Sequence, residues 1–182
     1  MAKLLDKIII VDVESTCWEN PKEQKTQKSE IIEIGLCTID IISQGLENVN
    51  GLIIRPEHST VSEFCSNLTS LTQEEVDKGM TYLAATEQLI EIYHSKQRAW
   101  ISYGDYDRKM FINMSRLHKV PYPFGPTHIN IKNLFALKNG LKKEVGLSRA
   151  LEMIGEKFEG IHHRGKDDSI NIAKIVRHIL YA

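Results

Sequence analysis

The sequence has little cysteine and no long apolar run, and each shortage excludes a class of protein. Its three cysteines, Cys17, Cys37 and Cys65, are far apart and form no Cys-x-x-Cys pair, which argues against a disulfide framework or a structural zinc cluster. They predict a reducing compartment, the cytoplasm. The apolar run Ile8–Val11 is too short for a signal peptide or a membrane span, so we expect a soluble protein without membrane contact.

Net charge is also nearly absent, because 23 Lys and Arg face 24 Asp and Glu and leave −1. This balance excludes a uniformly basic nucleic-acid coat and argues against wholesale disorder. The sum conceals an asymmetry, since residues 1–91 hold 7 basic and 16 acidic side chains while residues 92–182 hold 16 and 8. From Arg108 to Arg149 there are nine basic residues and one acid, Glu144. Such a segment is compatible with a local anion site and with a solvated basic face.

A single domain over residues 1–182 is expected from the length, with no internal repeat. The β-branched segment Ile8–Glu14 predicts a strand buried on both faces in the middle of a sheet. Two further strands, Ile31–Ile42 and Leu46–Ile54, should pair antiparallel with it, and Ala99–Tyr103 is a short fourth strand.

Helices are predicted after these first strands. The segment Thr72–Glu75 has the form of a capping box and should open a short helix that ends at Gly79. Glu19–Glu30 reads as an exposed loop, and Ile129–Leu137 is open between strand and helix. The other expected helices are Thr81 to about Ser95, Asp107–Lys119, Ser148 to about Ile154, and Asp168 to the C-terminus. This order predicts an α/β fold with a mixed sheet flanked by helices.

The first candidate functional group is the acidic pair in the buried strand, Asp12 and Glu14. Burial of an unpaired, ionised carboxylate in an apolar setting costs roughly several kcal/mol of folding free energy, and metal binding would offset this cost. Residues two apart leave the same face of a strand, so both side chains can grip one cation. The alternative is that the strand ends at Val11 and both acids lie in solvent.

The second group is the segment 162–168, His-His-Arg-Gly-Lys-Asp-Asp, before the last predicted helix. His162 with Asp167 and His163 with Asp168 have the same spacing. Asp168 lies on the apolar stripe of that helix, whereas Asp167 heads an outward line, so the pattern favours His163 and Asp168. The alternative is that either acid only caps the helix and that the histidines are loop residues.

The third group is the segment 103–107, Tyr-Gly-Asp-Tyr-Asp, which joins a predicted strand to a helix. Asp105 is expected to cap the helix. Asp107 then lies in the first turn, four residues before the apolar Phe111, and should point toward the sheet.

These three segments, in this order, resemble the DEDDh family of 3′→5′ exonucleases, which have an RNase H-like fold. The Thr-Cys-Trp after the first two acids and the segment 63–77 are similar to the Eri-type RNA exonucleases, which include histone-mRNA 3′-end enzymes and bacterial relatives. The resemblance extends from Ile8 to about Val176. One departure is Ser70, where the family more often has glycine.

The resemblance implies the roles of the charged residues. Four acids would hold two divalent ions, Mg²⁺ with Mn²⁺ as a possible substitute, and His163 would be the general base. Two ions about 3.5–4 Å apart stabilise the attacking and leaving oxygens of a phosphodiester displacement. The implied metal ligands are Asp12, Glu14, Asp107 and Asp168.

The resemblance also implies the substrate. The 3′-terminal nucleotide would lie against Thr16, with its base near Leu71 and Trp18, although Trp18 can equally be ordinary packing. Cys17 is expected to be a packing residue. The implied reaction removes 5′-mononucleotides from the 3′ ends of single-stranded RNA. The alternatives are a 3′→5′ DNA exonuclease and a non-catalytic RNA-binding module of the same fold.

Overall fold

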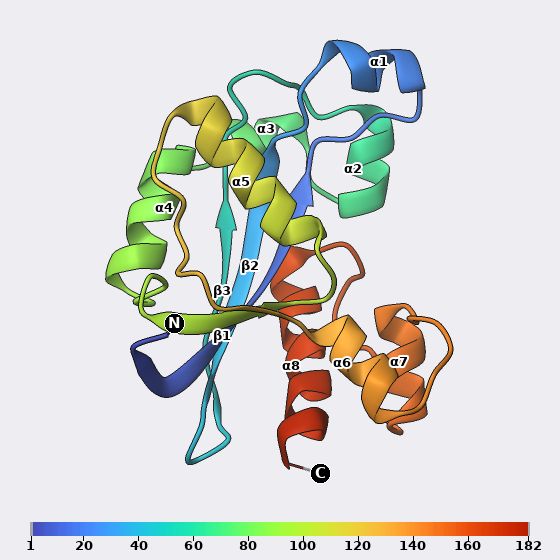
Figure 1. Cartoon of the computed structure of the whole chain (residues 1–182). Helices are drawn as coiled ribbons and strands as arrows, with labels where there is room; N and C mark the ends of the chain where they lie inside the picture. Colours follow the sequence, from blue (N-terminus) through green and yellow to red (C-terminus); the bar gives the residue numbers. More distant parts are fainter. Residues whose placement is uncertain (1, 182) are drawn as a thin grey trace.

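The chain folds around one mixed β-sheet that has helices on both faces (Figure 1). This computed structural model describes residues 2–181. The strands are β1 (Leu4–Ser15), β2 (Ile31–Asp40), β3 (Leu46–Ile53), β4 (Arg98–Ser102) and β5 (His128–Asn130). The helices are α1 (Pro21–Thr26), α2 (Glu63–Thr69), α3 (Gln73–Asp77), α4 (Tyr82–Glu91), α5 (Tyr106–His118), α6 (Ile131–Lys138), α7 (Leu147–Met153) and α8 (Gly165–Tyr181). No helix within residues 2–181 is long and apolar enough to cross a membrane.

The strand order is β3-β2-β1-β4-β5. β1 pairs antiparallel with β2, and β2 pairs antiparallel with β3, as the sequence predicted. β1 pairs parallel with β4, and β4 pairs parallel with β5. The acid-bearing strand is therefore the central one, with a neighbour on each side.

Alternate residues of β1 enter two different apolar cores. Ile9, Val11 and Val13 face α4 and α5, where they meet side chains such as Phe111. Ile10 points to the other face and packs with residues of α6, α7 and α8. Figure 1 shows α8, in red, on the opposite side of the sheet from α5. Because side chains alternate along a strand, Asp12 and Glu14 continue the Ile10 face toward α8.

Two expectations about helices were wrong. The segment expected to be an exposed loop contains α1, whose N-cap residue Asn20 accepts a hydrogen bond from the Lys22 N–H at 2.9 Å. Proline is favourable at the first helical position, so Pro21 begins this helix instead of preventing it. Ser148 was expected to cap the helix that runs to about Ile154, but Gly146 occupies the N-cap position of α7 and this helix begins at Leu147.

Other predictions were right in kind but not in detail. The Thr72–Glu75 capping box is present and opens α3. The ambiguous segment contains both a short strand, β5, and a helix, α6. The sequence predicted Leu83, Ala84, Leu89, Ile90 and Tyr93 as the apolar positions of the helix that begins after Thr81. Leu83 is instead 46% exposed, whereas Tyr82 and Ala85 are buried. Helix α2 was not among the predicted helices.

The last helix rests directly on the backbone of β2. A Cβ atom placed on Gly35 would lie 1.7 Å from the carbonyl carbon of Gly165, so only glycine fits there. α8 begins at Gly165, three residues before the expected start. This close approach brings the first turn of α8 over the carboxyl-terminal half of the central strand.

Candidate active site

The first two acids lie near the carboxyl end of β1, in the middle of the sheet. Asp12 pairs with Gly35 of β2 and Glu14 with Glu33, so the strand continues well past Val11. Glu14 is buried and Asp12 is half-buried. The alternative in which both acids lie in solvent is therefore excluded, and both side chains leave the face covered by α8.

Asp107 approaches the same place from the first turn of α5. Its side chain is 4% exposed, and its Oδ1 accepts a hydrogen bond from the Val13 N–H at 3.0 Å. The expectation that it points toward the sheet is confirmed. Asp105 occupies the N-cap position of α5 but makes no capping hydrogen bond through its side chain, so the expected cap is incorrect.

Asp168 is the acid of the last helix that enters the site. It is buried in the first turn of α8, whereas the Oδ2 of Asp167 accepts a hydrogen bond from the Ile161 N–H at 2.8 Å, outside the site. The prediction that Asp168, and not Asp167, points inward agrees with this arrangement. The expected outward line beyond Asp167 is wrong at Asn171, which is buried and donates to the Asp167 carbonyl at 2.8 Å.

The two adjacent histidines have different surroundings. The His162 ring stacks on Phe158, with centroids 3.6 Å apart, and does not line the acidic pocket. His163 is exposed, lines that pocket, and has a left-handed backbone with φ of 60°. Residues other than glycine rarely adopt this conformation, and when they do it is often at functional sites.

The four candidate acids and His163 line one open pocket of about 270 Å³. Oxygen atoms of Asp12, Glu14 and Asp168 lie within 4.8 Å of one another, close enough to share a cation. Carboxylate oxygens are the ligands that hard divalent ions such as Mg²⁺ prefer, so the donor set fits such ions. The residues that line the pocket are Asp12, Val13, Glu14, Tyr103, Tyr106, Asp107, Leu147, His163 and Asp168.

The clustering changes the acidity of the carboxyl groups. Burial, together with the charge of Asp168, raises the pKa of Glu14 to about 8. Burial also raises the pKa of Asp107 to about 6 and moves the pKa values of Asp12 and Asp168 upward. Like charges this close disfavour ionisation, and a divalent cation would relieve both burial and repulsion.

The three residues expected to contact substrate, Thr16, Trp18 and Leu71, do not line this pocket. The Thr16 hydroxyl is buried, accepts from the Glu30 N–H at 2.9 Å and lies 2.9 Å from the Ser59 hydroxyl oxygen. Trp18 is 3% exposed, and Leu71 is 1% exposed in a small apolar cluster. Ser70 ends α2 in the left-handed conformation, with φ of 60°, where glycine has no steric penalty.

Glu33 is a residue of the site that the sequence analysis missed. It is buried on β2, and its Oε2 accepts hydrogen bonds from the Gly165 N–H and the Arg164 Nε, both at 3.1 Å. Its Oε1 accepts from the Lys166 N–H at 3.4 Å. Glu33 thus holds the first turn of α8, which carries Asp168. The available signal was a lone acid in the apolar run Ile31–Leu36.

Comparison with known proteins agrees with this geometry. The family model described as exonuclease (RNase_T) matches residues 9–176, which is most of the chain. The chain therefore belongs to this exonuclease family. The predicted DEDDh-type, RNase H-like resemblance is confirmed by a solved nuclease domain of a DEDDh family member.

The chain is 33% identical to 3′-5′ exoribonuclease 1 of Rattus norvegicus, over 96% of this chain and 53% of the rat protein. It thus spans about half the length of that relative. The solved nuclease domain of 3′hExo, a DEDDh family member bound to rAMP, is 29% identical and superimposes with a TM-score of 0.88 over 99% of this chain and 94% of that chain. A 3′-exonuclease studied for its 3′-end specific recognition of histone mRNA stem-loop is 30% identical, with a TM-score of 0.87, and covers 96% of this chain and 81% of that chain.

Proposed function

We propose that this chain is a metal-dependent 3′→5′ exonuclease that removes 5′-mononucleotides from the 3′ ends of single-stranded RNA. The observation that carries the proposal is the convergence of Asp12, Glu14 and Asp168, with ligand oxygens within 4.8 Å, in a pocket that His163 also lines. Membership of the exonuclease family supports the reaction class.

The side chains divide into two roles. Asp12, Glu14, Asp107 and Asp168 would hold two divalent ions, Mg²⁺ or Mn²⁺. When bound, such ions supply charge stabilisation to the oxygens of a phosphodiester displacement. His163 would take the proton from the attacking water, because its exposed imidazole lines the pocket and histidine is the most common general base in enzymes.

The preference for RNA is supported by the relatives. The rat protein is named an exoribonuclease, and the 3′hExo nuclease domain was solved with rAMP. We carry that preference to this chain because the similarity covers nearly all of it. Thr16, Trp18 and Leu71 remain candidates for contacts with the terminal nucleotide. The Thr16 hydroxyl, N–H and carbonyl all have hydrogen-bond partners within the protein, so a contact with the nucleotide would have to be shared with one of these or made by the Thr16 methyl group.

The three cysteines are free, which is compatible with the proposed cytoplasmic location. No disulfide is needed to close the site, because its side chains come from β1, from the helices α5, α7 and α8, and from the loops that carry Tyr103 and His163.

The deciding experiment is a gel time course with end-labelled RNA and DNA of matched sequence, with Mg²⁺, with Mn²⁺ and with EDTA. We expect stepwise shortening from the 3′ end, faster on RNA, that EDTA abolishes. Faster shortening of DNA would favour the DNA exonuclease, and binding without shortening in either metal would favour the non-catalytic module.

Two variants and a matched control test the residue roles. Asp12→Asn and His163→Ala should each remove most of the activity. His162→Ala is the control, because His162 is the adjacent histidine but stacks on Phe158 outside the pocket. Full activity in both Asp12→Asn and His163→Ala would contradict the proposed site.

A further inference from the structure

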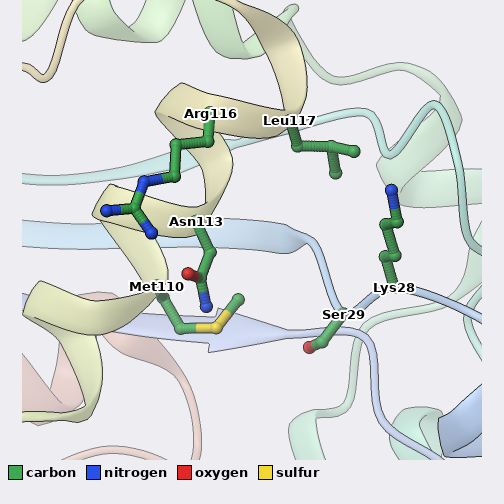
Figure 2. Close-up of a pocket in the computed structure, with 6 residues that line it drawn as sticks. All are labelled: Lys28, Ser29, Met110, Asn113, Arg116 and Leu117. Carbon is green, nitrogen blue, oxygen red and sulfur yellow. The ribbon is translucent and has the colours of Figure 1, made fainter.

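A second pocket lies along α5, next to the segment that leads into β2 (Figure 2). Its volume is about 450 Å³, larger than that of the acidic pocket. It is lined by Lys28, Ser29, Met110, Asn113, Arg116 and Leu117. Nothing in the catalytic proposal uses these six residues.

One face of α5 connects the two pockets. Tyr106, Met110, Asn113 and Leu117 are spaced by four, three and four residues, so they form one stripe along the helix. Tyr106 lines the acidic pocket, while the other three line the second pocket. From Tyr106 to Leu117 the helix rises about 16 Å, which is a distance of a few nucleotides for a single strand.

The wall opposite α5, which contains Lys28 and Ser29, is hydrogen-bonded to the chain at the end of β1. The Ser29 hydroxyl donates to the carbonyl of Thr16 at 2.6 Å, and the Tyr106 Oη lies 2.5 Å from the Ser15 Oγ. Residues 15 and 16 directly follow Glu14 at the end of β1. Both walls of the second pocket are therefore anchored beside the acidic cluster.

The lining has the chemistry of a nucleotide contact surface. Met110 is buried and Leu117 half-buried, so they provide an apolar floor. Lys28 and Arg116 are exposed at the rim, and within residues 2–181 neither side chain makes an ion pair or hydrogen bond. Figure 2 shows Arg116 and Lys28 on opposite sides of the pocket with Asn113 between them. Cations attract phosphates, and apolar surface accepts any base.

We propose that this second pocket binds the RNA chain a few nucleotides away from the terminal nucleotide held at the acidic cluster. Lys28 and Arg116 contact phosphates, Met110 and Leu117 support a base, and Asn113 offers hydrogen bonds to its edge. This inference rests on the proposed function, because it identifies the ligand as the substrate of that same site. Its consequence is that the affinity for RNA depends on length.

The test compares the double variant Lys28→Ala/Arg116→Ala with Lys3→Ala/Arg177→Ala. Lys3 lies just before β1 and Arg177 in the second half of α8, both are exposed, and the charge change is the same. Each pair is measured in an Asp12→Asn background, so that labelled RNA is not consumed. The readout is fluorescence anisotropy with a dodecanucleotide and a dinucleotide across a range of salt concentrations.

Loss of the two rim cations should weaken dodecanucleotide binding about tenfold at low salt and reduce the slope of log affinity against log salt by about 1.4, for two phosphate contacts on a single strand. Dinucleotide binding should not change, and the control pair should behave like the unsubstituted protein. An unchanged slope, an equal loss in the control pair, or an equal loss for the dinucleotide would each overturn the proposal. Adenosine monophosphate is measured as a third ligand. A loss of its affinity without a loss of dodecanucleotide affinity would identify a mononucleotide site and would also overturn the proposal.

Failure of the proposed function looks different. In that case the unsubstituted chain releases no mononucleotide from RNA in the gel assay, whereas the length-dependent binding and its salt slope are still measurable. The apolar floor has its own variant, Leu117→Asp, which places a negative charge in the pocket without touching the acidic cluster. It should reduce dodecanucleotide affinity and leave dinucleotide affinity unchanged.

Discussion

The carboxylate of Glu33 accepts a hydrogen bond from the backbone N–H of Gly165 at 3.1 Å and thereby fixes the first turn of α8 on β2. An acceptor at a helix N-terminus satisfies N–H groups that have no partner within the helix. Asp168 lies in that same turn, so the position of this proposed metal ligand depends on Glu33, an acid of strand β2.

Removal of the Glu33 carboxylate should lower activity by displacing Asp168. Glu33→Ala should lower kcat about tenfold or more, because small displacements of catalytic groups have large effects, while KM changes little. It should also lower the free energy of unfolding by about 1–3 kcal/mol, the cost of buried donors without partners. Steady-state kinetics and urea titration measure the two effects. Glu87→Ala, at an exposed position of α4, is the control and should change neither.

The contact between Gly35 and Gly165 predicts a steric effect. In Gly35→Ala the new methyl group would lie 1.7 Å from the Gly165 carbonyl carbon, so α8 must move away from β2. We expect a loss of about 3 kcal/mol in the free energy of unfolding and loss of nuclease activity. Gly146→Ala is the matched control, since no atom lies within 4 Å of its added Cβ. Normal stability of Gly35→Ala would show that the backbones are not in contact.

Metal removal should produce a characteristic pH dependence of stability. In the folded chain the pKa of Glu14 is raised to about 8 and that of Asp107 to about 6, above their values in an unfolded chain. The folded state therefore holds these protons more tightly, so their contribution to stability is complete below a pH of about 4 and is lost as the pH rises through 6 and then 8.

This dependence is measured by urea titration at several pH values in EDTA. We expect the free energy of unfolding to fall with rising pH in EDTA and to fall much less in Mg²⁺ or Mn²⁺, because a cation bound only by the folded state stabilises it. Glu14→Gln should flatten the curve in EDTA. A curve that is identical with and without divalent ions would argue against a metal at this cluster.

Thr16 offers a test of a structural against a substrate role. Thr16→Val keeps the shape but leaves the Glu30 N–H without its acceptor, so we expect a loss of about 1–3 kcal/mol in stability. Thr16→Ser retains the hydroxyl and should lose only about 1 kcal/mol, the value of one buried methyl group. If Thr16→Val instead keeps full stability and raises only KM, the hydroxyl contacts substrate and not the loop that contains Ser59.

The sequence by itself determined the central strand and its acids. Period-two and period-3.6 patterns depend on neighbouring residues, so the strand with Asp12 and Glu14, and the helix with Asp107 in its first turn, were predictable from local order. The inward stripe of the last helix was sufficient to choose Asp168 over Asp167. The resemblance to the exonuclease family then followed from the order of the three acidic segments.

Only the tertiary structure decided what joins segments that are distant in the chain. The Glu33 cap on α8, the Gly35 and Gly165 contact, and the burial of Trp18 and Leu71 depend on how layers pack, which no local pattern encodes. The same is true of the pocket between Lys28 and Arg116, where residues 88 positions apart in sequence face one space. Local periodicity specifies which face of an element is apolar, whereas the packing of elements specifies which polar groups meet.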